Sequence, residues 1–186
     1  MPGLPQLDPA LAAVAAGFIA LLLVRAAFHK ATDFVAFTGT LSDYRILPDT
    51  LVTPAAVMLA VVEAGLALGL LWSETRPYAG VLSAGLLAVY AAAMAGPLMQ
   101  GRTEISCGCG GPTDHLSPAL LIRNGLLGLI ALAAAAPVTA RALGWFDMAS
   151  VPMAVLVLWL ILETAEQALQ NQAYITALNS RLKSEG

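Results

Sequence analysis

The chain has 186 residues, of which 59% are hydrophobic and only 11% are charged, and its formal net charge is -3. Its mean hydropathy is +0.78. Soluble domains carry roughly a quarter charged residues, so this composition excludes a surface that is mostly exposed to water. The lack of a basic cluster excludes nucleic acid as a partner. The composition therefore predicts an integral membrane protein embedded in a lipid bilayer.

Four apolar segments are long enough to cross the hydrocarbon core, which takes about 20 residues. They are residues 10–28, 51–72, 77–99 and 116–136. A fifth run, 146–164, is short at its apolar centre and spans the membrane only if it begins near Trp145. The opening MPGLPQLDP lacks the basic region of a secretory signal, so the first segment is expected to be retained. The chain is thus expected to form one all-α transmembrane domain, a four-helix bundle followed by a fifth hydrophobic helix.

Two further segments have helical periodicity without being long apolar spans. In residues 31–46, apolar side chains recur at intervals of three and four, which predicts a short helix on the membrane surface or across the end of the bundle. These side chains are Phe34, Phe37, Leu41 and Tyr44. Residues 165–186 are amphipathic, which predicts a helical tail that continues the fifth segment into water.

Both cysteines of the chain, Cys107 and Cys109, lie in a Gly- and Pro-rich stretch just before the fourth span. Ser117 and Pro118 suit the N-cap and first position of that helix. The positive end of a helix dipole favours thiolate over thiol. Gly108 gives the backbone freedom to close a small, strained ring, and strained accessible disulfides are easily exchanged. The pattern predicts a redox-active pair, in which one cysteine is attacked by a partner's thiolate and the second resolves the mixed disulfide.

Two alternatives stay open for this pair. Cys107, Cys109 and His115, with Met94 or Met99 nearby, offer soft ligands for Cu(I) or zinc. Their spacing matches no strong zinc signature. In the other alternative the thiols are inert small side chains, and the protein is a non-catalytic membrane scaffold.

Three ionisable residues, Arg25, Glu63 and Arg123, fall inside predicted spans. Such residues are rare at membrane depth, are usually paired, and often mark function. A pair between Glu63 and either Arg123 or Arg25 is expected to offset the cost of burial. That pair either fixes helix register or allows Glu63 to relay protons during thiol oxidation. Lys30, just after the first span, is expected at the membrane interface.

Several of these motifs together resemble the MauE family, which is grouped with DoxX-like membrane proteins. They are FHKATDFVAFTGTLSDYRILP after the first span, Glu63 in the second, ISCGCGGP before the fourth and LIRN within it. The resemblance covers most of residues 15–130. It implies a bundle similar to that of vitamin K epoxide reductase-type proteins. It also implies a role in disulfide formation or redox maturation of exported cysteine-containing proteins, beside a thioredoxin-like partner.

Carried over by position, the resemblance makes Cys107 and Cys109 the redox pair, with Glu63 and Arg123 as catalytic polar residues of the core. It further implies a quinone as electron acceptor, for which Asn124 and Arg25 are the candidate binding residues. One departure is Gly110, because the family often has an aromatic residue after the second cysteine.

The side of the membrane that the cysteines face is predicted differently by two arguments. With five spans, their end of the bundle carries more basic residues: Lys30, Arg45, Arg102, Arg181 and Lys183. The opposite end carries Arg76 and Arg141, so the positive-inside rule favours the cytoplasm for the cysteines. The resemblance implies the outer face of a bacterial inner membrane, where oxidising dithiol chemistry belongs, and we favour that side. The sequence leaves open whether a homo-oligomer forms.

Overall fold

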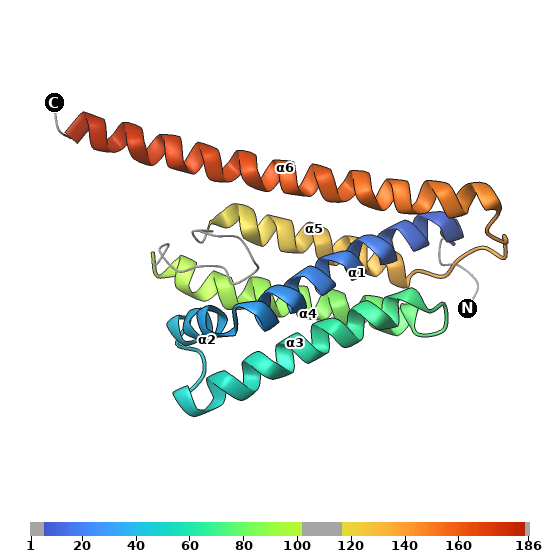
Figure 1. Ribbon diagram of the computed structural model, residues 1–186, viewed down its shortest axis with the longest axis horizontal. Coiled ribbons are helices and arrows are strands. Elements are labelled where there is room, and N and C mark those ends of the chain that lie inside the picture. The colour runs from blue at the N-terminus through green and yellow to red at the C-terminus, as the bar shows by residue number, and fades with distance from the viewer. Residues whose placement is uncertain (1–5, 102–116, 185–186) are drawn as a thin grey trace.

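The computed structural model describes residues 6–101 and 117–184, with the side chains of the last helix described through residue 169 and at 171. The described residues form six helices, and their only β-type pairing is one isolated bridge. Five of the helices are long and apolar enough to cross a bilayer. The predicted all-α integral membrane fold is therefore confirmed (Figure 1).

Four helices form an antiparallel bundle, in which α1 packs between α3 and α5, and α4 packs between the same two helices (Figure 1). They are α1 (Pro9–Thr32), α3 (Asp49–Leu71), α4 (Arg76–Met99) and α5 (Pro118–Ala135). Helices in lipid associate through close packing of small residues. A Cβ atom added at Gly80 would lie 2.7 Å from the carbonyl oxygen of Ala131. The glycine therefore allows α4 to approach the backbone of α5.

The last helix, α6 (Trp145–Ser184), is continuous over 40 residues, and its part long enough to span is Trp145–Leu169. It begins at Trp145, the start that the short fifth apolar run needs in order to cross. α6 lies along the outside of α1 (Figure 1), where a Cβ atom at Gly17 would come within 3.0 Å of Val155. None of its most apolar window is buried by protein, so lipid must cover most of its surface.

The short helix α2 (Phe34–Asp43) crosses one end of the bundle and packs on α1 and α3. It is shorter than the predicted 31–46, because α1 continues through Thr32 and only Asp33 separates the two helices. Tyr44, which follows α2, is buried beside Met94 of α4. α2 thus closes the end of the bundle at which α4 ends and α5 begins (Figure 1).

At the opposite end of the bundle, hydrogen bonds and ion pairs join distant parts of the chain. The backbone N–H of Leu7 donates to the carbonyl oxygen of Pro137 at 2.9 Å. The guanidinium of Arg141 donates to Asp8 at 2.8 Å and to Asp147 at 2.8 Å. These bonds tie together the start of α1, the connection after α5 and the first turn of α6.

Candidate functional site

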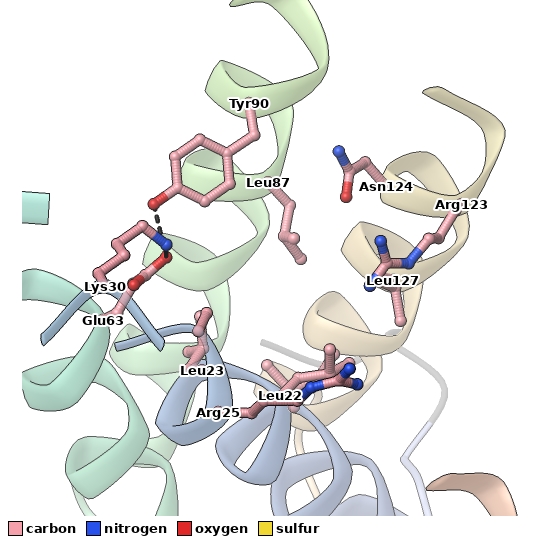
Figure 2. Close-up of a pocket in the computed structure, with 12 residues that line it drawn as sticks. Leu22, Leu23, Arg25, Lys30, Glu63, Leu87, Tyr90, Arg123, Asn124 and Leu127 are labelled. Carbon is pink, nitrogen blue, oxygen red and sulfur yellow. Dashed lines mark hydrogen bonds and ion pairs between the residues drawn. The ribbon is translucent and has the colours of Figure 1, made fainter. Parts of the chain in front are cut away.

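Glu63 lies on α3 and points into the bundle, where none of its surface is exposed. Its Oε1 accepts a hydrogen bond from Lys30 Nζ at 2.8 Å and another from the Tyr90 hydroxyl at 2.6 Å. Lys30, on α1, is 2% exposed, and Tyr90 comes from α4 (Figure 2). Three helices thus bring an acid, a base and a hydroxyl together, and we name Lys30, Glu63 and Tyr90 the buried acid–base cluster.

Aromatic rings surround the cation of this cluster. The Lys30 ammonium lies 4.9 Å from the centre of the Phe37 ring and 5.6 Å from that of Tyr90. A buried ion pair repays its desolvation cost only with good geometry and additional contacts. Cation–π attraction supplies such contacts. Because Phe37 belongs to α2, the helix that crosses the bundle end also covers the buried ammonium.

The predicted pairing of Glu63 with Arg123 or Arg25 is wrong. Arg25 pairs with Glu163 and Arg123 pairs with Glu166, the latter at 2.8 Å, and both glutamates are on α6. Figure 2 shows the two arginines across the cavity from Glu63. The arginines therefore attach α6 to the bundle, one from α1 and one from α5.

The predicted interfacial position of Lys30 is also wrong, and this explains the error in pairing. The first span was expected to end at residue 28, but α1 continues through Thr32. Lys30 therefore belongs to the last turn of α1, and α2 turns back over it. A lysine that the sequence placed in a loop is instead the partner of the central carboxylate.

A small cavity of about 40 Å³ lies beside the cluster. The Oε2 atom of Glu63 is buried and has no hydrogen-bond partner in the part of the chain that the structure describes. One water needs roughly 10–15 Å³ of such volume and two to four polar neighbours. The cavity therefore has room for about three waters next to an unsatisfied carboxylate oxygen.

The structure brings the polar residues of the predicted site to this one cavity. Arg25, Arg123 and Asn124 line it together with Glu63. Asn124 is 5% exposed on α5. In Figure 2 these three residues lie on the far side of the cavity, with leucines between them and the cluster. They share a cavity with Glu63 but do not form its ion pair.

Cys107, Cys109 and His115 lie outside the described residues, so the structure tests neither the redox pair nor the alternative metal ligands. In the described ranges, 6–101 and 117–184, no group of three or more His, Cys, Asp or Glu side chains is placed to hold a metal ion. Ser117 stands at the N-cap of α5 as predicted, although its side chain makes no capping hydrogen bond.

Four residues of the cavity and its surroundings were not assigned from the sequence: Lys30, Tyr90, Glu163 and Glu166. A signal for the two glutamates was present, because residues three apart share a helix face and two intramembrane arginines needed partners. Lys30 was not assigned to the cavity because the first span was expected to end at residue 28. Nothing in the local sequence distinguishes Tyr90 from an interfacial tyrosine.

Comparisons with known proteins agree on one family. The family model described as methylamine utilisation protein MauE matches residues 8–137. The chain is 42% identical over 120 residues to the methylamine utilization protein MauE of Paracoccus denitrificans, covering 63% of this chain and 64% of that protein. This match thus spans just under two thirds of that relative.

Two further MauE proteins match over longer stretches. That of Paracoccus versutus is 35% identical over 147 residues, 77% of this chain and 79% of its own. That of Methylorubrum extorquens is 38% identical over 146 residues, with 76% and 78% covered. No solved structure matches significantly. The match of the family model contains the four-helix bundle and the buried acid–base cluster, and the chain belongs to the MauE family of methylamine utilisation proteins.

Proposed function

We propose that this protein is a membrane thiol–disulfide oxidoreductase, or the membrane partner of one, that supports redox maturation of exported proteins used in methylamine utilisation. The observation that carries the proposal is the buried acid–base cluster, because ionisable groups at membrane depth mark function by default. Lys30 is in the last turn of α1 and its ammonium lies against Phe37 of α2. The α2 end of the bundle is also the end at which α4 ends and α5 begins (Figure 1). The sequence that joins these two helices contains Cys107 and Cys109.

The proposed chemistry consists of two balanced steps. First, a dithiol partner reduces the Cys107–Cys109 disulfide by exchange, so the partner gains a disulfide and the protein gains two thiols. Second, the two thiols lose two electrons to an external two-electron oxidant, so the sulfur–sulfur bond re-forms and two protons are released. Glu63 accepts a proton in this second step through Oε2, for which the described residues provide no donor. Lys30 and Tyr90 hold the carboxylate in place through its other oxygen.

The proposed dithiol partner is a thioredoxin-like protein, and the cysteines are proposed to face outward from a bacterial inner membrane. A quinone as electron acceptor stays a prediction from the family resemblance. Pockets for drug-sized ligands measure about 300–1,000 Å³, whereas the cavity beside Glu63 measures about 40 Å³. The cavity does not fit a quinone ring, so Arg25 and Asn124 are not assigned to quinone binding and no step is derived through it.

Thiol trapping tests the proposal directly, because the chain has only two cysteines. Cells are quenched with acid, and a maleimide mass tag is added before and after treatment with dithiothreitol. We expect wild type to gain two tags only after reduction, and one of the two single variants, Cys107→Ser or Cys109→Ser, to be trapped as a mixed disulfide with its partner. The Cys107→Ser/Cys109→Ser variant supplies the untagged control.

Two outcomes would contradict the redox function. A pair that stays reduced in cells and copurifies with stoichiometric copper or zinc would favour metal binding by Cys107, Cys109 and His115. Full activity of the double serine variant in methylamine utilisation would favour a non-catalytic scaffold.

A further inference from the structure

A second and larger hollow lies at the opposite end of the molecule from α2. It is a groove of about 620 Å³ between α1, α6 and the end of α3. The volume is within the range of pockets that hold small ligands. Its lining is almost entirely apolar, with side chains such as Ala13, Leu70 and Leu156, and Arg76 and Ser73 are its polar exceptions. Since the helices that form it are membrane spans, the groove is accessible to lipid.

Arg76 differs from the arginines that anchor the helices. Arg25, Arg123 and Arg141 each pair with a carboxylate. Arg76 is half-buried, its Nε atom is fully buried, and the described residues provide it with neither an ion pair nor a hydrogen-bond acceptor. A buried N–H donor without an acceptor is costly, and the planar donors of a guanidinium suit a phosphate. The lining that the described residues give to the groove therefore has an anion-binding group but no acidic side chain.

The charged end and the apolar part of the groove are arranged like the head group and the acyl chain of a membrane lipid. Arg76 is the first residue of α4, at the end of a span. From that end the lining follows α1 from Ala13 to Leu21, a distance of about 12 Å along a helix toward the middle of the bilayer. A cation at the membrane surface and an apolar channel toward the centre match a charged head and an acyl chain.

We propose that this groove binds one anionic phospholipid, with its phosphate on Arg76 and an acyl chain between α1 and α6. A quinone has carbonyl oxygens that accept hydrogen bonds but no anionic head, so it would leave the charge of Arg76 without a counter-ion. The bound lipid fills the gap between α6 and the end of α3. This proposal rests on the groove alone and does not depend on the proposed redox function.

Native mass spectrometry of the intact protein tests the proposal. The protein is exchanged from mild detergent into mixed micelles that contain equal phosphatidylglycerol and phosphatidylethanolamine. We expect wild type to retain one phosphatidylglycerol, and Arg76→Gln to retain about tenfold less, which corresponds to the loss of one modest charged contact. Arg45→Gln is the matched control, because Arg45 is exposed and lies near the α2 end.

A groove variant separates the chain site from the head site. Ala13→Phe places a ring in the lining and is expected to lower retention of both lipids, and the Arg76→Gln comparison still decides if this variant does not fold. Equal retention of phosphatidylglycerol by Arg76→Gln and wild type would overturn the proposal. Equal binding of the two lipids by wild type, or a copurified quinone in the same stoichiometry, would also overturn it.

Discussion

Two of the ion pairs among the described residues, Lys30–Glu63 and Arg141–Asp8, have the same distance of 2.8 Å but differ in what surrounds them. Within the bundle, the side chains of Lys30 and Glu63 are 3% and 0% exposed. At the opposite end, those of Arg141 and Asp8 are 44% and 41% exposed. Water and salt screen the exposed pair, whereas nothing replaces a partner lost from the buried one. Two ion pairs with the same distance are therefore expected to contribute unequally to the free energy of unfolding.

The largest effect is expected from breaking the buried pair. Lys30→Met leaves the Glu63 carboxylate without its cation in an apolar bundle, which costs about 3–5 kcal/mol in other buried pairs. The free energy of unfolding in detergent micelles, measured by reversible denaturation, should fall accordingly. The double variant Lys30→Met/Glu63→Leu should recover most of this loss, because it leaves no unpaired charge. A single variant as stable as wild type would show that the pair is not formed.

The next effect concerns function and compares the two carboxylates directly. Glu63→Gln keeps an oxygen that accepts from Lys30 and Tyr90 but removes the group that takes up a proton. Loss of a general base typically costs about 100-fold or more, so reoxidation of the dithiol should slow by that order.

The matched control for this variant is Asp8→Asn, at the exposed cluster, which should leave reoxidation unchanged. The amount of folded protein recovered by gel filtration separates a catalytic loss from a folding loss. Wild-type turnover in Glu63→Gln would remove Glu63 from the mechanism.

The sequence predicted the spans well because an apolar run of sufficient length has few alternatives in a membrane. For the fifth run the sequence left crossing conditional on a start near Trp145, and α6 begins at that residue. The sequence also identified Glu63, because a carboxylate within a span is conspicuous. The sequence could not show which basic side chain lies near Glu63 in three dimensions. Choosing among Arg25, Arg123 and Lys30 as the partner requires knowing how the helices are rotated and where α1 ends.

Lys30 shows why this limit is physical. A difference of four residues at the end of α1 decides whether the Lys30 side chain reaches water or enters the bundle, and α2 packs on this helix and on α3. The groove at Arg76 was equally out of reach, because it is formed by α1, α3 and α6, which are distant in sequence. Local patterns determine helices, while the site depends on how the helices meet.

The smallest effect is expected at the exposed cluster, and it should depend on pH. Hydrogen bonds from the Arg141 guanidinium and the backbone N–H of Ala10 hold the pKa of Asp8 below its ordinary value of 3.8. A carboxyl whose pKa is lower when folded adds stability above its ordinary pKa, and loses that contribution as the pH falls below it. Thermal unfolding of wild type should therefore shift to lower temperature more steeply than that of Arg141→Gln as the pH falls from 5 to about 3. High salt at neutral pH should narrow the difference between the two proteins. If Arg141→Gln matched wild type at every pH and salt concentration, the exposed cluster would contribute no measurable stability, and the contrast with the buried pair would be wider than proposed.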